Sequence, residues 1–212
     1  LDVVTGSNWI VRKNFIANHS KHGSDNVSYA LFLKGNGSNG LIESNIIDCE
    51  WSVDNDGFTR VGISLGGGGT GEKYCRGGSC PVEHSNGVIK NNLVLNCSQD
   101  VGIYLNKAAN TQVVHNTLLN TLGVDIRFES SSAIVSNNVM TNVIRTRNGA
   151  TMTQNNNITS YSAIDTELFS TVLSLAEQDL CGIKRFKFSA TGAMSFQCSE
   201  KLSLRLLSSK ID

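Results

Sequence analysis

The chain has 212 residues, and 40% of them are hydrophobic, which is enough for one ordinary domain with a continuous core. Its 18 Lys and Arg residues balance its 18 Asp and Glu residues, so no global positive field attracts nucleic acid or an anionic membrane. No apolar run approaches the ~18 residues of a membrane span. The chain begins abruptly at LDVVTGSNW without a signal peptide, from which we expect a processed or truncated product.

A segment centred on asparagine recurs along the chain. It has an apolar residue three positions after its start, Asn after six positions and an apolar residue after eight. The copies are NWIVRKNFIAN (8–18), NGLIESNIIDC (39–49), NGVIKNNLVLNC (86–97), NTQVVHNTLLN (110–120) and SAIVSNNVMTN (132–142), with a degraded copy at ATMTQNNN (150–157). The central asparagines at 14, 45, 92, 116 and 138 lie 31, 47, 24 and 22 residues apart. A repeating coil of about 22 residues therefore carries insertions early in the chain.

A second unit interleaves with the first: YALFLK (29–34), VGISLG (61–66), VGIYLN (101–106), VDIRFE (124–129) and VIRTR (143–147). Its period of two predicts strands with one buried face. The side chains expected to point inward are Leu31, Leu33, Ile63, Leu65, Ile103, Leu105, Ile126 and Phe128. Those expected to point outward are Phe32, Lys34, Ser64, Gly66, Tyr104, Asn106, Arg127, Glu129, Arg145 and Arg147.

These short strands, one turn asparagine in every coil and a single proline predict an all-β right-handed parallel β-helix. Each coil would stack on the last at ~4.8 Å, with apolar ladders inside and asparagine amides bonded between coils. The alternative is an antiparallel sandwich of short strands. Asn-Gly hairpins do not explain an asparagine at a fixed offset between two apolar positions, so we favour the β-helix.

The composition changes after Asn157, because none of the remaining 55 residues is asparagine. We therefore expect a parallel β-helix domain over 1–160, with N-terminal coils missing, and a C-terminal cap and tail over 161–212. Helical spacing over 165–180 predicts a helix that covers the last coil. Alternation over 183–198 and 201–207 predicts a small β meander.

Six cysteines permit three disulfides, although buried thiols would fit the same spacing. A Cys181–Cys198 bond would hold the meander. Cys49 and Cys97 follow equivalent strands, and either a bond or stacked thiols would suit that placement. Disulfides favour an exported protein, so we expect a secreted, periplasmic or cell-surface location.

The longest insertion, GGGGTGEKYCRGGSCPVEHSNG (66–87), follows a predicted strand. It lacks the Gly-Lys-Ser/Thr of a phosphate-binding loop and the following helix. Two alternatives remain open: a Cys75–Cys80 disulfide that holds a glycine-rich loop, and a metal site made of Cys75, Cys80, Glu83 and His84. Because insertions on stacked repeats commonly gather on the binding face, the loop marks a candidate site.

The repeat units N-G-x-I-x-x-N-x-I/V and G-I-x-L resemble those of the pectate-lyase-like β-helix superfamily, including proteins similar to chondroitinase B and alginate lyases. The resemblance covers about residues 6 to 157. It implies the parallel β-helix fold. Members include lyases, hydrolases, epimerases and adhesive or structural stalks, so the fold alone does not give the function.

The outward stripe suits an acidic polysaccharide, since aromatic rings pack on sugar faces and arginine pairs with uronate carboxylates. A solvated sheet face is the alternative. For cleavage by β-elimination we expect Lys73 or His84 as base, Arg76 or Arg127 to neutralise the carboxylate and Tyr104 as proton donor. Additional substrate contacts are expected from Lys34, Trp51, Arg60, Asn106 and Arg145, and Ca²⁺ ligation from Glu50, Asp54 and Asp56. The competing function is a non-catalytic adhesive or glycan-binding β-helix, with end-to-end or lateral self-association.

Overall fold

The computed structural model describes residues 1–21, 25–53, 57–67, 69–159, 177–185, 192–194 and 198. The first sheet contains β1 (Asp2–Val4), β4 (Val27–Lys34), β8 (Thr59–Leu65), β12 (Ile103–Asn106), β16 (Val124–Arg127) and β19 (Ile144–Arg147). The second contains β2 (Ile10–Arg12), β6 (Leu41–Glu43), β10 (Val88–Lys90), β14 (Thr111–Val114), β17 (Ser132–Ser136) and β20 (Thr151–Asn155).

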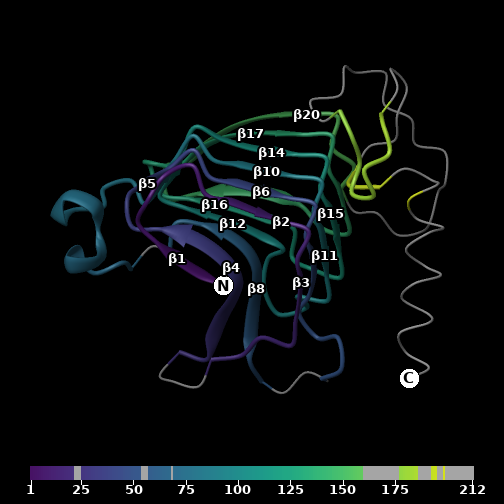
Figure 1. The fold of residues 1–212 in the computed structure, drawn as a ribbon, viewed down its shortest axis with the longest axis horizontal. Helices are drawn as coiled ribbons and strands as arrows, with labels where there is room; N and C mark the ends of the chain where they lie inside the picture. Colours follow the sequence, from purple (N-terminus) through teal and green to yellow (C-terminus); the bar gives the residue numbers. More distant parts are fainter. Residues whose placement is uncertain are drawn as a thin grey trace.

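The third sheet contains β3 (Phe15–Ala17), β7 (Ile46–Asp48), β11 (Leu93–Leu95), β15 (Thr117–Leu119) and β18 (Val139–Met140). A short sheet contains β5 (Gly37–Ser38), β9 (His84–Ser85) and β13 (Ala108–Ala109). Two single-turn 3-10 helices, η1 (Glu72–Tyr74) and η2 (Arg76–Gly78), lie in the connection between β8 and β9. Figure 1 shows this connection projecting to one side of the stacked strands.

The chain visits the sheets in turn. After β4 in the first sheet it passes through β5, β6 and β7, and it returns to the first sheet as β8. Figure 1 shows the resulting layers, with the strands of the second sheet stacked from β2 to β20. All pairings between these named strands are parallel. The predicted all-β chain with parallel pairing is confirmed, and the antiparallel sandwich is wrong.

The core lies between the sheets and consists of in-register aliphatic side chains. In the first sheet the predicted inward residues Leu31, Leu33, Ile63, Leu65, Ile103, Leu105 and Ile126 are buried. Phe128 does not join them, and its predicted inward position is wrong. It follows β16 at a left-handed turn with φ 76°, is only partly buried, and lies 4.5 Å from the Arg127 guanidinium.

An asparagine ladder runs along the turns between the second and third sheets. Each Nδ2 donates to the Oδ1 of the next member over 2.9 to 3.0 Å, in the order Asn14, Asn45, Asn92, Asn116, Asn138 and Asn157. The same amides donate to strand carbonyls, as Asn92 does to Ile42. Because buried amides are costly without partners, this ladder stabilises the register of neighbouring parallel strands.

Three disulfides pair all six cysteines: Cys49–Cys97, Cys75–Cys80 and Cys181–Cys198. The first joins the turns after β7 and β11. Cys49 and Cys97 therefore form a disulfide, and the alternative of two stacked free thiols is wrong. The second lies within the glycine-rich loop. The third links two described parts of the tail.

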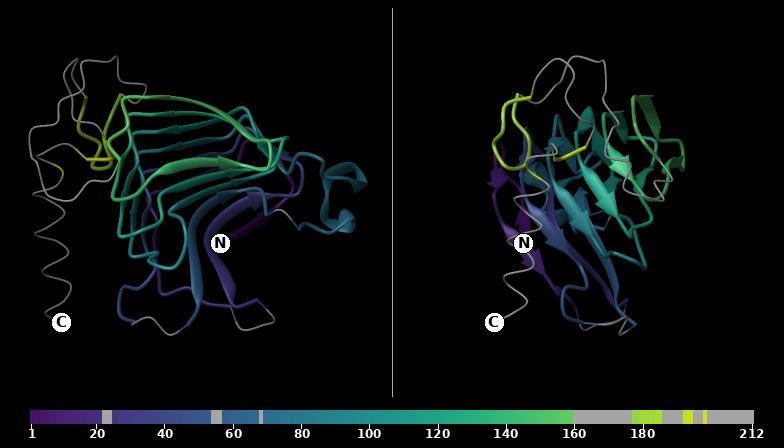
Figure 2. Two further views of the ribbon diagram at one scale, coloured as in Figure 1. Left: turned by 180° about the vertical axis from the view of Figure 1, so that it is seen from behind. Right: turned by 90° about the vertical axis from the view of Figure 1, so that its right-hand side faces the viewer.

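The described part of the tail lies against the corner that carries the ladder (Figure 2). Asn91 Nδ2 donates to the Gln178 carbonyl over 2.6 Å, and the Ala193 N–H donates to Thr117 Oγ1 over 2.9 Å. Arg185 is buried and donates to Asn91 Oδ1 over 3.0 Å. Most of the expected cap helix and meander lies outside the described residues. Within the described ranges, no helix has the length and apolar character needed to cross a membrane.

Candidate functional site

The outer face of the first sheet brings together most of the predicted stripe. Strand register places Phe32, Ser64, Tyr104, Asp125 and Arg145 in one row across the strands. A second row two residues further on contains Lys34, Asn106, Arg127 and Arg147. We call these residues together with Tyr29 the first-sheet face. Adjacent strands lie ~4.8 Å apart, so the side chains within each row are evenly spaced.

The N-terminal end of the first-sheet face is aromatic. The Tyr29 and Phe32 ring centroids lie 4.9 Å apart, and Lys34 Nζ lies 4.1 Å above the Phe32 ring. Lys34 also pairs with Asp2 over 3.2 Å. Burial raises the pKa of Tyr29 to about 12, so its hydroxyl stays protonated at physiological pH. Flat rings beside an ammonium group can pack on a sugar and contact an acidic substituent.

The other end carries three arginines. Asp125 is buried and accepts hydrogen bonds from Arg145 Nη2 at 3.0 Å and Arg147 Nε at 2.8 Å. Arg127 Nη1 donates to Tyr104 Oη over 3.3 Å, and this hydrogen bond raises the Arg127 pKa. The side chains of Arg145 and Arg147 remain 46% and 42% exposed, so both guanidinium groups can still reach a ligand.

Two buried polar atoms in the middle of this face have no hydrogen-bond partner in the described structure: Asn106 Oδ1 and Arg127 Nε. Asn106 and Arg127 are directly paired in register. Buried polar atoms normally find partners, and those left unpaired often mark a place where a ligand or water completes the bonds. Asn106 Oδ1 can accept one more hydrogen bond and Arg127 Nε can donate one, and both atoms are buried.

Sequence reasoning overlooked Asp100 and Asp125 beside the first-sheet face. Alternation within VDIRFE already places Asp125 on the same side as Arg127, so its position was available from the pattern. Asp100 lies in the turn before β12, and burial, followed by the nearby Asp125 carboxylate, raises its pKa. The sequence pattern does not show that Asp100 is buried near Asp125, because this depends on how neighbouring strands and turns pack together.

The glycine-rich loop is closed by one buried carboxylate. Glu83 accepts hydrogen bonds from the Gly67 N–H at 2.7 Å and from Thr70 Oγ1 at 2.6 Å. Gly66 has φ 77°, and a Cβ atom there would lie 1.8 Å from the Asn106 carbonyl oxygen. Only glycine fits this position, because the loop leaves the sheet against the neighbouring strand.

Lys73 and Arg76 lie on the projecting part of this loop. Lys73 Nζ lies 4.7 Å from the Tyr74 ring centroid, and Arg76 Nη1 donates to Ser7 Oγ over 3.1 Å. The Arg76 N–H also donates to the Gly35 carbonyl, so this part of the loop is hydrogen-bonded to the turn after β4. Within the described part of the chain, the contacts of both residues are with the loop itself and with the N-terminal strands and turns, and none is with Tyr104 or Arg127. The alternative metal site is wrong, because Cys75 and Cys80 are bonded to each other.

His84 does not fit the predicted role of base. It lies in β9, is 2% exposed, and its Nε2 accepts the Gly40 N–H at 3.1 Å. Burial lowers its pKa to about 4. Gly40 and Gly87 leave the space that its ring occupies, since a Cβ on either would meet the ring at 2.9 to 3.0 Å. The imidazole is thus part of the packed interior.

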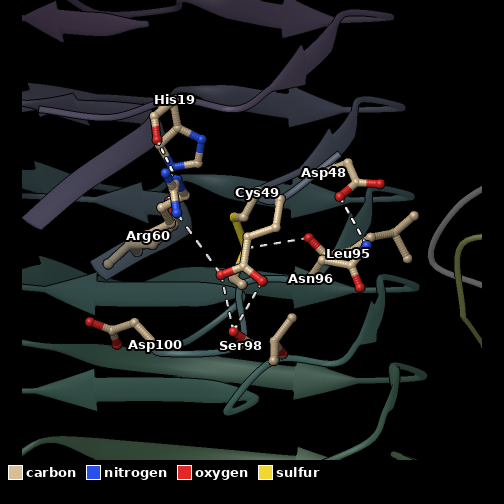
Figure 3. The surroundings of a disulfide bond; sticks show 12 residues. His19, Asp48, Cys49, Arg60, Leu95, Asn96, Ser98 and Asp100 are labelled. Atoms are coloured by element: carbon tan, nitrogen blue, oxygen red, sulfur yellow. Dashed lines mark hydrogen bonds and ion pairs between the residues drawn. A yellow bond between two sulfur atoms is a disulfide. The ribbon is translucent and has the colours of Figure 1, made fainter. Parts of the chain in front are cut away.

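Arg60 and Glu50 also lie in structural contacts. Arg60 is 2% exposed, its Nε donates to the His19 carbonyl over 2.7 Å, and its Nη1 lies 4.0 Å from Glu50 Oε1. Ser98 Oγ donates to Glu50 as well. Figure 3 shows these groups beside the Cys49–Cys97 disulfide. Burial therefore makes Arg60 unsuitable for polysaccharide binding.

The predicted calcium site is not supported by its one described ligand. The Glu50 carboxylate is already occupied by Ser98 and the Arg60 guanidinium. Asp54 and Asp56 lie outside the described residues. Trp51 contacts the Phe15 ring edge-on at 5.4 Å between centroids, which places it at the third sheet instead of the first-sheet face.

Comparisons of the chain with family models, with curated proteins and with solved structures find no match.

Proposed function

We propose that the chain is an exported right-handed parallel β-helix of the pectate-lyase-like type that binds an acidic polysaccharide along the first-sheet face. The fold part of the proposal rests on the parallel sheets visited in turn and on the asparagine ladder. Export is supported by the three disulfides, because such bonds persist in oxidising compartments.

The observation that carries the binding proposal is the set of cationic and aromatic side chains that β4, β16 and β19 place on the first-sheet face. Lys34, Arg127, Arg145 and Arg147 supply positive groups, and the partly buried Tyr29 and Phe32 supply rings. Regular spacing of strands matches a regular polymer better than a single small molecule. Uronate residues combine a flat sugar face with a carboxylate, the two features that these side chains recognise.

A second function, cleavage by β-elimination, is favoured by one contact. Tyr104 Oη lies 3.3 Å from Arg127 Nη1, so a uronate carboxylate bound by Arg127 would lie near a group able to transfer a proton. In this step Arg127 would neutralise the carboxylate, a solvent water would take the C5 proton, the C4–O glycosidic bond would break, and Tyr104 would donate its proton to the departing oxygen. The double bond formed between C4 and C5 of the uronate absorbs ultraviolet light, which distinguishes elimination from binding alone.

The experiment measures binding of alginate, pectate and chondroitin by calorimetry, with ultraviolet absorbance recorded in parallel. Arg127→Gln removes a charge-assisted contact and is expected to weaken binding about tenfold. The matched control is Arg12→Gln on the second sheet, whose side chain is 59% exposed, and its affinity should equal that of the wild type. Equal losses in both variants, or no binding to any of these polymers, would overturn the proposal.

Tyr104→Phe separates the two functions. If the protein is a lyase, this variant keeps most of its affinity and loses the formation of the absorbing product. If the wild type binds without producing absorbance, the elimination function is wrong and the binding function stands.

A further inference from the structure

The chain contains four Asn-Gly pairs, and the structure separates one of them from the other three. The pairs are Asn36–Gly37, Asn39–Gly40, Asn86–Gly87 and Asn148–Gly149. In the first three pairs the glycine is buried. In the fourth pair both residues are exposed, in the turn between β19 and β20. The dipeptide is the same in all four, so the fold can give them different chemical behaviour.

The three buried glycines are held by interior contacts. The Gly40 N–H donates to His84 Nε2 over 3.1 Å, and this hydrogen bond is buried. The Gly37 N–H donates to the Glu83 carbonyl over 3.2 Å. Gly87 packs against the same His84 ring. The backbone nitrogens of these glycines therefore cannot approach a neighbouring side chain unless packed interior groups move apart.

The fourth pair lies in a left-handed turn with few contacts. Asn148 has φ 56° and Gly149 has φ 83°, the signs that a type I′ turn requires at its two central residues. The Ala150 N–H closes the turn by donating to the Arg147 carbonyl over 3.3 Å. Within the described part of the chain, neither the Asn148 side chain nor the Gly149 N–H makes a hydrogen bond. Both groups can therefore react when the exposed turn opens locally.

We propose that Asn148 is a site of spontaneous modification, in which it is converted to aspartate and isoaspartate through a cyclic imide. The Gly149 nitrogen attacks Asn148 Cγ and loses its proton to solvent. The new C–N bond closes a five-membered ring, the Cγ–Nδ2 bond breaks, and the side-chain nitrogen takes up a proton and leaves as ammonia. Water then opens the ring at either carbonyl carbon, which gives aspartate or isoaspartate. Glycine permits the attack because it has no Cβ atom to hinder the approach.

The modification changes the charge of the molecule at a defined place. The formal net charge falls from zero to minus one, since one neutral amide becomes one carboxylate. The new carboxylate directly follows Arg147, which belongs to the cationic end of the first-sheet face. It therefore lowers the positive charge at the end of the face to which the proposed function assigns acidic groups. The chemistry does not depend on that function, so a failure of polysaccharide binding would leave the modification standing.

The test follows all four pairs in the full folded protein, with its disulfides intact, during incubation at mildly alkaline pH in heavy-oxygen water. Only aspartate formed during the incubation carries the heavy oxygen, and tandem mass spectrometry of tryptic peptides assigns it to each pair. Label should appear at Asn148 about tenfold or more faster than at Asn39, because reaction at Asn39 must first break the buried hydrogen bond of Gly40. In reduced protein unfolded in guanidinium chloride, the four pairs should react at comparable rates, which is the control.

Two results would overturn the proposal. One is no label at Asn148 of the folded protein while the unfolded chain becomes labelled. The other is label at Asn36, Asn39 or Asn86 as fast as at Asn148. Ion-exchange chromatography of the intact wild type should also show a growing acidic form that matches Asn148→Asp in charge. Asn148→Gln should lack this form, because its longer side chain does not close a five-membered ring, and equal growth of the acidic form in a folded Asn148→Gln variant would contradict the assignment.

Discussion

Three histidines within the fold are kept neutral by burial. The pKa is lowered to about 4 for His19 and His84, and to about 3 for His115, with desolvation as the largest cause in each case. None lies on the first-sheet face. Protonation of these histidines is therefore expected to change the stability of the fold more than ligand binding.

These pKa values predict acid sensitivity of the fold. In the unfolded chain the histidines titrate near 6.5, whereas in the folded chain they titrate near 4 or below. The unfolded state binds protons first as pH falls, so the stabilisation from neutral burial is complete above pH 6.5 and is lost between pH 6.5 and 4. The urea midpoint should fall across this window.

His84→Gln supplies the matched variant for this prediction. It removes one titrating group, so its midpoint should depend less on pH than that of the wild type. A wild-type midpoint that is constant from pH 6.5 to 4 would show that the histidines do not charge on unfolding.

At the element scale, the glycine-rich loop depends on Glu83 at its base. The carboxylate holds Gly67 and Thr70, while the Cys75–Cys80 disulfide constrains the distal part. Four consecutive glycines give the unfolded loop high conformational freedom, so the contacts that order it must offset a large entropy loss. Glu83 provides charge-assisted hydrogen bonds for this purpose.

Glu83→Ala is expected to loosen the loop and to expose the peptide bonds after Lys73 and Arg76 to trypsin. Each lost charge-assisted hydrogen bond is worth ~1.5–3 kcal/mol, so cleavage should accelerate by about tenfold or more if local opening limits it. Mass spectrometry of the timed digest measures both sites. Glu72→Ala, in the same loop but without these contacts, is the control. Equal cleavage rates in the two variants would contradict the role given to Glu83.

For the whole molecule, the repeat predicts the parallel pairing because one alternating strand and one asparagine recur in each coil. The same alternation brings Lys34, Tyr104, Asn106, Arg127 and Arg145 to one face. The alternation does not predict the burial of a side chain that depends on residues from neighbouring repeats.

His84 and Arg60 illustrate that failure. His84 is buried because Gly40 and Gly87 leave space for its ring, and Arg60 because a loop carbonyl and Glu50 cover its guanidinium. The residue pattern within one repeat predicts neither contact, because the contacting groups come from other repeats. Phe128 leaves the alternation because the chain turns immediately after Arg127.

The central claim is that the first-sheet face recognises the carboxylates of a polysaccharide. The most direct measurement compares the affinity of the wild type for polygalacturonate with its affinity for the same polymer after its carboxyl groups have been reduced to alcohols, at one ionic strength. Loss of the charge-assisted contacts should weaken binding by about tenfold or more. Equal affinity for the charged and reduced polymers would contradict the account.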